Sequence, residues 1–504
     1  MDQPVVSRIP PEVLEHIFLD CYHDHSVVPS ITDAPFNISQ TCSRWREVAV
    51  CVPRLWSSFA IIFSSGHSRP SLPVLQRWLY RSGFYPISFS LIYHEPVAYS
   101  VEIFASDLNR DLFKVLRTLV GHVDRWKSVY LDLSNIPYDA EFPSHLDHAL
   151  SQAPSLPNLK DLEIRTFQVH PRHNNCSLIP SYLTWLSGLA SSASSLESYS
   201  RYGDGYRNHL LSVPTGNLTT LYLERETEFG CLQSLKNSPC LVECHFSEIL
   251  SDHEWNLPFS AVRTPKLRKL VLEPQEALFE TLFPSLVAAN LEHLEILVDL
   301  QSTRYQTQYM NPLLGLRSFL RESSCPLTTL ILRPLLLSKS TLEDCLTVVS
   351  STLTTFITSG FEKAHAKRTR QATWQPLNST FCIGDSILER LTYTGEPGIV
   401  LCPHLETVVF HSCVNASEGK LGDFVESRWR ADPEIGHAAQ IKKVDVELFK
   451  SSSHADVEKL EGIFAEGLQG SVRMAPGIRL AIKEDGVVDR PPSNVPVLQR
   501  PSNW

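Results

Sequence analysis

The chain has 504 residues, of which 43% are hydrophobic and 20% are charged, as in a folded protein and unlike a disordered one. This length exceeds what one compact core supports, so we expect a large domain with one or two smaller ones. The net charge of −10 argues against nucleic acid as the main partner, and no stretch approaches the roughly 18 consecutive apolar residues of a membrane span.

The N-terminus and the cysteines bear on the cellular compartment. The opening stretch MDQPVVSRIPPEVLEHIF has no basic segment followed by an apolar run and a small-residue cleavage site, so no secretory signal is visible. The 12 cysteines are scattered without a C-x-x-C pair, as expected for reduced thiols. We therefore expect a protein of the cytosol or nucleus with no membrane partner.

Two stretches near the N-terminus predict short amphipathic helices. IPPEVLEHIF (9–18) has a proline that suits the first helical turn, followed by a stripe at i, i+3, i+4. That stripe consists of Leu14, Ile17 and Phe18. FNISQTCSRWREVAVCVPRLWSSF (36–59) predicts one continuous helical face that ends before Pro53 and is followed by Leu55 and Trp56. The residues of this second face are Ile38, Cys42, Trp45, Ala49 and Val52.

Two interpretations of this N-terminal module are open. It is either a helical cap that shields the end of the next domain, or a surface that holds another protein. A module of about fifty residues buries only part of its surface, and exposed apolar side chains usually mark a contact site.

A short phrase then recurs along the chain: an apolar residue, two free positions, an apolar residue, one free position and an apolar residue. The last two apolar positions are two apart and so face one side of a strand, while the first turns the chain into it. The clear copies are 157–164, 216–223, 239–246, 265–272, 289–296, 325–332 and 402–410, and the weaker copies are 194–200, 351–358 and 386–393. From Leu196 to Leu291 the leading residues recur every 22 to 26 positions, within the leucine-rich-repeat range of about 20–29.

Helix-like runs separate these strands at 276–289, 312–323 and 341–351. Degenerate helix–strand units precede them at 71–93 and 107–133, and a strand at 441–449, a helix near 455–467 and a strand at 477–483 are expected to close the last edge. The fold class is therefore α/β: a short helical module followed by a curved, leucine-rich-repeat-like solenoid with a parallel sheet inside and helices outside. The expected domains are 1–57, 58–484 and a proline-rich tail at 485–504.

Several other groups of residues could carry chemistry. Cys21, His23, His25 and Cys42 match no standard zinc spacing, and Cys240, Cys244 and His245 lie within a predicted strand, where a buried thiol is a small hydrophobe. No catalytic, phosphate-binding or dinucleotide motif is present, so we expect no enzyme activity of the chain and no cofactor. The basic run 362–374 is a solvated loop between repeats, a nuclear-import signal or a contact for an acidic partner.

The stretch 197–209, ESYSRYGDGYRNH, is rich in tyrosine and arginine, which dominate binding hot spots. Tyr199 occupies a repeat position and is assigned to the core. The remaining candidates for contact with a target protein are Arg201, Tyr202, Tyr206 and Arg207.

The two N-terminal stretches together resemble an F-box, a motif of roughly fifty residues that docks a Skp-family adaptor. The resemblance rests on the Ile-Pro-Pro-Glu-Val-Leu start, the Cys-Ser-Arg-Trp-Arg-Glu-Val-Ala helix and Pro-Arg-Leu-Trp, with the segment 20–35 standing where a typical F-box has a short turn and another helix. The combination with degenerate leucine-rich repeats resembles the fungal, mushroom-type F-box group. It implies that adaptor contacts come from Pro10, Pro11, Leu14, Ile17, Phe18, Trp45, Leu55 and Trp56.

This resemblance implies a function without chemistry of its own. The chain would be the substrate receptor of a Skp–cullin–F-box ubiquitin ligase, in which the repeats hold an unidentified target protein near a ubiquitin-charged enzyme. The alternative is an interaction scaffold of the same shape whose F-box-like module serves only as a structural cap.

Overall fold

The computed structural model describes most of the chain, in segments separated by gaps. The described residues are 9–21, 30, 32–64, 67–94, 105–135, 156–166, 181–203, 216–250, 261–274, 279, 281–298, 313, 315–333, 337–360, 383–395, 400–431, 438–448 and 454–474.

The protein is an α/β structure built on one 15-stranded, mostly parallel sheet. From β1 its strands follow one another in chain order to β17 at one edge, and β2 forms the other edge beyond β1, where it makes the one antiparallel pairing among the described strands of this sheet. The strands are β1 Ser58–Ser64, β2 His67–Arg69, β3 Ile87–Tyr93, β4 Trp126–Asp132, β5 Asp161–Arg165, β6 Ser198–Tyr202, β7 Thr220–Glu224, β8 Glu243–Ile249, β10 Lys269–Pro274, β12 His293–Leu297, β13 Thr329–Arg333, β14 Thr355–Ser359, β15 Thr407–His411, β16 Lys443–Leu448 and β17 Gln469–Met474. A separate two-stranded sheet joins β9 Val262–Arg263 to β11 Leu286–Val287.

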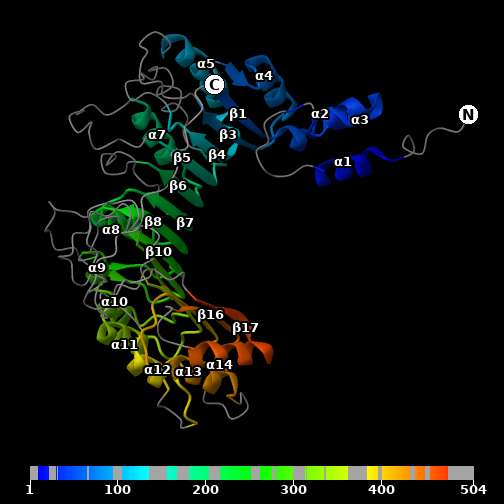
Figure 1. The fold of residues 1–504 in the computed structure, drawn as a ribbon. Coiled ribbons are helices and arrows are strands. Elements are labelled where there is room, and N and C mark those ends of the chain that lie inside the picture. The colour runs from blue at the N-terminus through cyan, green and yellow to red at the C-terminus, as the bar shows by residue number, and fades with distance from the viewer. Residues whose placement is uncertain are drawn as a thin grey trace, which may run out of the picture.

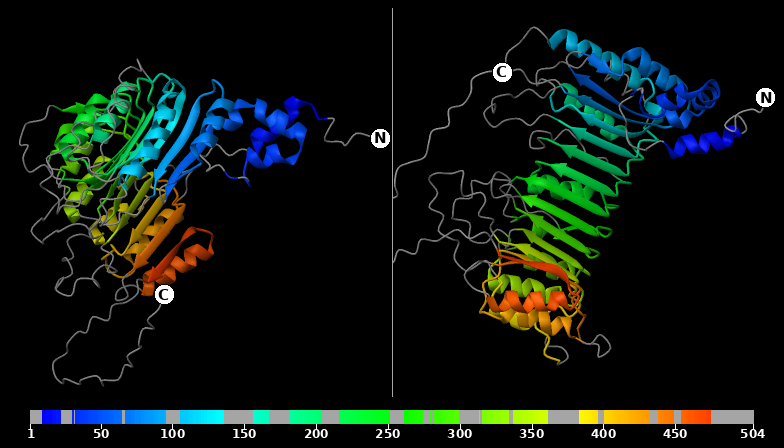
Figure 2. Two further views of the ribbon diagram at one scale, coloured as in Figure 1. Left: turned by 90° about the horizontal axis from the view of Figure 1, so that it is seen from above. Right: turned by 45° about the vertical axis from the view of Figure 1, so that its right-hand side comes forward.

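Helices cover one side of this sheet, which bends into an arc with the strands on its inner side (Figure 1). From α4 onward the helices are α4 Leu72–Arg81, α5 Ala105–Val120, α7 Ser181–Ser192, α8 Glu228–Asn237, α9 Leu282–Ser285, α10 Leu316–Ser323, α11 Lys339–Val348, α12 Asp385–Leu391, α13 Lys420–Trp429 and α14 His454–Ala465, with the 3₁₀ turn η3 Val123–Arg125. The strands in the middle of the sheet are seen face on in the right-hand view of Figure 2, with no described helix in front of them. We call this uncovered side the open face.

The core lies between the sheet and its helices and is formed by the recurring phrase. Each leading leucine is buried, and the last two apolar positions of the phrase point from the strand toward the helices. Leu221 and Leu223 of β7, for example, are both buried, whereas Tyr222 between them lies on the open face and is half-buried. Because the strands are parallel and in register, residues at the same position of successive phrases lie side by side on neighbouring strands.

The N-terminal module projects from the β1–β2 end of the sheet (Figures 1 and 2). It consists of α1 Pro11–Asp20, α2 Phe36–Thr41, α3 Ser43–Cys51 and the 3₁₀ turn η2 Pro53–Trp56. β1 begins at Ser58, beside the domain boundary expected at residue 57.

Three predicted segments differ from the structure, and two others lie outside the described residues. The continuous helix expected across 36–52 is two helices, because Cys42 is extended and its sulfur caps α3 by accepting from the Trp45 N–H at 3.5 Å. Most of the segment 386–393 belongs to α12 and none of it to a strand. Within 276–289 the described residues include the short helix α9, which contains Pro284 and leads into β11. The last strand is β17, since 477–483 lies outside the described residues, as does the tail 485–504.

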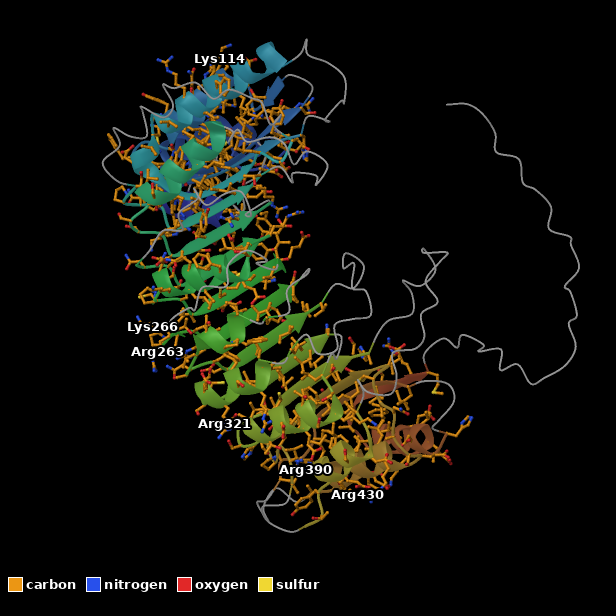
Figure 3. The ribbon with its side chains drawn as sticks, turned by 90° about the vertical axis from the view of Figure 1, so that its left-hand side faces the viewer. Lys114, Arg263, Lys266, Arg321, Arg390 and Arg430 are labelled. Carbon is orange, nitrogen blue, oxygen red and sulfur yellow. The ribbon has the colours of Figure 1, made fainter. Side chains whose placement is uncertain are left out.

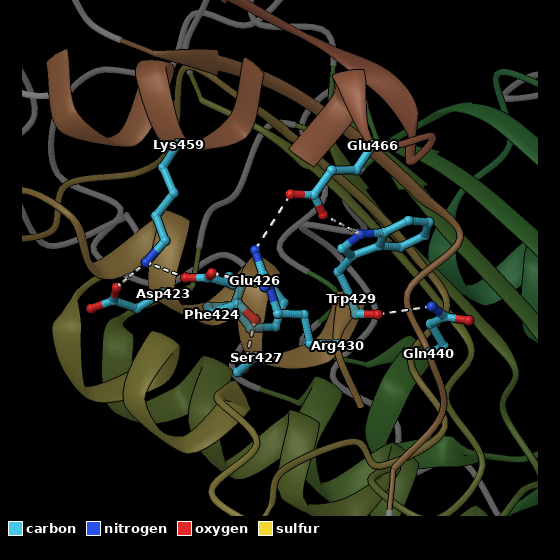
Figure 4. A network of polar contacts seen from close by, with 9 residues as sticks. All are labelled: Asp423, Phe424, Glu426, Ser427, Trp429, Arg430, Gln440, Lys459 and Glu466. Atoms are coloured by element: carbon cyan, nitrogen blue, oxygen red, sulfur yellow. Dashed lines mark hydrogen bonds and ion pairs between the residues drawn. The ribbon is translucent and has the colours of Figure 1, made fainter. Parts of the chain in front are cut away.

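The helical side is a solvated surface of locally paired charges. Figure 3 looks onto this side, and its labelled cations include Lys114 of α5, beside Asp111, and Arg390 of α12, beside Glu343. At the far end, Lys459 of α14 contacts Asp423 at 2.7 Å and Glu426 at 2.5 Å, so that it joins α14 to α13 (Figure 4). Exposed pairs of this kind add about 0–1 kcal/mol each and set solubility more than stability.

In the described part of the chain, no helix combines the length and apolar character needed to cross a membrane.

Candidate functional site

The first helix has one buried and one exposed apolar face. Leu14 and Phe18 are fully buried beneath it, whereas Val13 is 46% exposed and Ile17 is 40% exposed. Val13 and Ile17 lie four residues apart on one side of the helix, and Pro10, the exposed N-cap residue, comes three residues before Val13. We call these three residues the α1 strip.

Trp45 lies between this surface and the core. Its indole is 5.1 Å from the Phe18 ring, and the side chain is half-buried against the core cluster. Phe18 of α1 covers one side of the Trp45 indole, and part of the Trp45 side chain remains exposed to solvent.

Trp56 joins the module to the sheet. Its indole N–H donates to the Ala49 carbonyl at 2.8 Å, which ties η2 to the end of α3. The ring meets Trp78 of α4 at 5.1 Å in an edge-to-face arrangement, and the Arg81 guanidinium lies 4.3 Å from its centre. Leu55 beside it is fully buried, so this part of the module is interior.

The eight residues expected to contact an adaptor fall into a buried group and a surface group. Leu14, Phe18, Leu55 and Trp56 are core residues, because α1 packs against α3 and η2 within the module, and η2 packs against β1 and α4 of the sheet region. The residues left at the surface are Pro10, Pro11, Ile17 and part of Trp45. Sequence reasoning missed Val13, which the helical spacing from Pro10 to Ile17 identifies as a member of the same exposed side.

The four residues of 197–209 expected to contact a target protein do not lie together on one described surface. Arg201 points inward and is buried against Glu226, the two side chains being 2.5 Å apart, so it is not a surface residue. Tyr202 is the next residue of β6 and therefore lies on the open face. Tyr206 and Arg207 lie outside the described residues.

Tyr202 belongs to a row of side chains that runs across the open face, one from each of six neighbouring strands. Its members are Tyr130 of β4, Arg165 of β5, Tyr202 of β6, Tyr222 of β7, His245 of β8 and Glu273 of β10. We call this row the tyrosine ladder. Sequence reasoning found Tyr202 alone. The free position between the two inward residues of a phrase marks Tyr222 and His245, and the position after the second inward residue marks Arg165, Tyr202 and Glu273.

Consecutive members of the ladder are in contact. The Arg165 guanidinium lies 5.5 Å from the centre of the Tyr130 ring and 4.4 Å from that of Tyr202. Tyr202 stacks on Tyr222 at 4.4 Å, and Tyr222 meets the His245 ring edge-on at 4.7 Å. His245 Nε2 is 3.0 Å from Glu273 Oε1, and the Ser247 hydroxyl donates to Glu273 Oε2 at 2.5 Å.

The ionisation states follow from these surroundings. Burial is the main cause that raises the pKa of Tyr130 and of Tyr222 to about 12, so both phenols stay protonated at neutral pH. The hydrogen bond from His245, with that from Ser247, lowers the pKa of Glu273, which is therefore a carboxylate. The ladder thus combines neutral tyrosine rings with the Arg165 cation near its β4 end and a fixed negative charge at its β10 end.

Metal binding and thiol chemistry find no support among the described residues. These residues include no group of three or more His, Cys, Asp or Glu placed to hold a metal ion, and His23 and His25 lie outside them. Burial raises the pKa of the Cys244 thiol well above its ordinary value and that of Cys345 and Cys402 to about 12, which leaves them as unreactive core residues.

Comparison with known proteins adds no relative. No protein-family model matches the chain, and no curated protein matches it. Functional inference therefore rests on the α1 strip, the tyrosine ladder and the residue patterns that resemble an F-box.

Proposed function

We propose that the protein is a non-catalytic receptor of a Skp–cullin–F-box ubiquitin ligase, acting in the cytosol or nucleus. The N-terminal module would dock a Skp-family adaptor through the α1 strip. The repeated region, a leucine-rich-repeat-like solenoid in this proposal, would hold the target protein.

The α1 strip is the observation that carries the adaptor role. Val13 and Ile17 remain exposed although the neighbouring Leu14 and Phe18 are buried, so the helix offers a second apolar side with no covering among the described residues. An amphipathic helix that presents residues at i, i+3 and i+7 is a common docking element for a hydrophobic groove.

One observation favours a second function, the scaffold whose module is only a cap. Trp56 and Leu55 belong to the same continuous core as the sheet, which is how a terminal cap of a repeat protein packs. A cap needs no exposed apolar strip, and this difference separates the two functions.

The test is binding of the full-length protein to a purified Skp-family adaptor, measured by titration calorimetry. The informative variant is Val13→Asp/Ile17→Asp, which changes exposed side chains and should leave the fold intact. The matched control is Tyr80→Asp/Phe84→Asp, because these residues are 85% and 99% exposed elsewhere on the protein. We expect the first variant to weaken binding by about 100-fold and the control by no more than about two-fold.

Each other result has a defined meaning. No binding by the unmodified protein removes the receptor role and leaves the scaffold. Equal weakening by the two double variants removes the α1 strip as the docking surface.

A further inference from the structure

The tyrosine ladder is surrounded by more carboxylates than cations. On the open face of β4 to β10 the acidic side chains are Asp132, Asp161, Glu163, Glu224, Glu243 and Glu273. The cations on the same strands are Arg165, Lys269 and the exposed Lys127 of β4, and the charges of Lys127 and of neighbouring Lys160 act on Asp161. Arg165 is itself paired with Glu163 at 3.2 Å, so the aromatic row lies in a negative field.

This composition ends part-way along the sheet. The corresponding open-face positions of β13, β14 and β15 are Ile331, Ile357 and Val409, in register with one another. Acidic residues and tyrosines are therefore concentrated on the half of the open face nearer the N-terminal module.

The ladder already shows how it holds a cation. The Arg165 guanidinium lies between the Tyr130 and Tyr202 rings and beside the Glu163 carboxylate. Cation–π contact and a flanking carboxylate are the two interactions that select lysine or arginine side chains in a partner. The hydroxyls and ring edges of the tyrosines, half-buried in the sheet, give a rigid surface that loses little entropy on binding.

We propose that the tyrosine ladder binds an extended, cationic segment of the target protein, with its lysine or arginine side chains against the tyrosine hydroxyls and between the carboxylates. The excess of carboxylates around the ladder is complementary to a basic peptide, which is the partner that we propose. Six strands spaced about 4.8 Å apart span about 24 Å, the length of about seven residues of extended chain. The proposal names the target chemistry of the receptor described above and rests on it for its biological meaning, but the binding itself needs no adaptor.

The experiment measures fluorescence anisotropy of labelled decapeptides mixed with the full-length protein alone, at 150 mM salt. The probes are (Arg-Ser)₅ and its acidic counterpart (Glu-Ser)₅. The ladder variant is Glu163→Gln/Glu273→Gln, and the matched control Asp445→Asn/Glu447→Gln removes the same charge from β16 on the same face. We expect the ladder variant to weaken (Arg-Ser)₅ binding at least about 10-fold and the control to change it less than about two-fold.

A second variant tests the rings without changing charge. Tyr202→Ser/Tyr222→Ser should weaken (Arg-Ser)₅ binding to a similar degree, because it removes the stacked pair at the centre of the ladder. If the double carboxylate variant loses its circular-dichroism spectrum, Glu163→Gln alone is compared with Asp445→Asn alone. All of these variants keep the α1 strip. Adaptor binding can therefore be measured on the same samples, and its loss can be distinguished from a loss of peptide binding.

Three results would overturn the proposal: no (Arg-Ser)₅ binding, equal binding of the acidic peptide, or equal weakening by the ladder and β16 variants. The last result would mean that the overall charge attracts the peptide without a site.

Discussion

Trp56 and Trp78 meet edge to face with their ring centres 5.1 Å apart, and this contact joins the N-terminal module to the first helix of the repeated region. Phe36 of α2 completes the cluster, at 5.8 Å from Trp56 and 5.2 Å from Trp78. The module and the sheet therefore share one core, and a change at this contact should affect both.

Replacing Trp56 with alanine should destabilise the whole protein. The substitution removes a fully buried indole together with its hydrogen bond to Ala49, and such changes cost about 3–5 kcal/mol. Urea unfolding followed by circular dichroism measures the loss. Tyr80→Ala is the control on nearby α4, and its exposed ring should change the free energy of unfolding by less than about 0.5 kcal/mol. A mild effect of Trp56→Ala would show that the module does not share the core.

The buried pair Arg201–Glu226 makes a second prediction. Arg201 occupies an inward row in which its neighbours Ile164 and Leu223 are apolar, so its guanidinium has no water to solvate it, whereas the Glu226 side chain is 13% exposed. Glu226→Gln should cost about 3–5 kcal/mol, because the guanidinium stays buried without its carboxylate. Adding Arg201→Met to that variant should recover most of the loss, as measured by a double-mutant cycle in urea. Additive losses in the double variant would show that the two side chains act separately.

Arg428 bonds to backbone carbonyls near the end of α12 and has no acidic partner among the described residues. Its guanidinium donates to the carbonyls of Leu391, Leu401, Cys402 and Pro403 at 2.8–3.1 Å. Arg428→Met removes the guanidinium donor from all four carbonyls, although those of Cys402 and Pro403 keep the N–H groups of Leu405 and Ala439, and should cost about 3 kcal/mol. Arg430→Met is the control two residues later, because that side chain is 60% exposed and should contribute less than about 1 kcal/mol. Thermal unfolding of both variants checks the contrast, and equal losses would contradict it.

Glu273 should make stability depend on pH. Its pKa is lowered on folding, chiefly by the hydrogen bond from His245, from an ordinary value of 4.5. A carboxylate of this kind stabilises the fold at pH values above its unfolded pKa, and the contribution is lost as the pH falls through its folded pKa. Between pH 6 and pH 3, the free energy of unfolding should therefore fall more for the unmodified protein than for the Glu273→Gln variant. Urea midpoints at both pH values measure this difference, and parallel losses in the two proteins would refute the role of Glu273.

The recurring phrase determined much of the sheet without any tertiary information. "PNLKDLEI", for example, became β5, with Leu159, Leu162 and Ile164 all buried. Alternation along a strand is a local property, so it identifies which residues face the core. The same spacing misled at 386–393, because Leu388 and Leu391 are three residues apart and so also fit one face of a helix, which is what they form in α12.

The surfaces required the tertiary structure. Leu14 and Ile17 belong to the same predicted stripe, yet the first is buried and the second is 40% exposed, because packing against α3 and η2 decides which part of that stripe is covered. Sequence alone marked Tyr222 as a free position of its repeat. Its contacts with Tyr202 and His245, residues about 20 positions away in either direction, exist only because parallel register places those strands side by side.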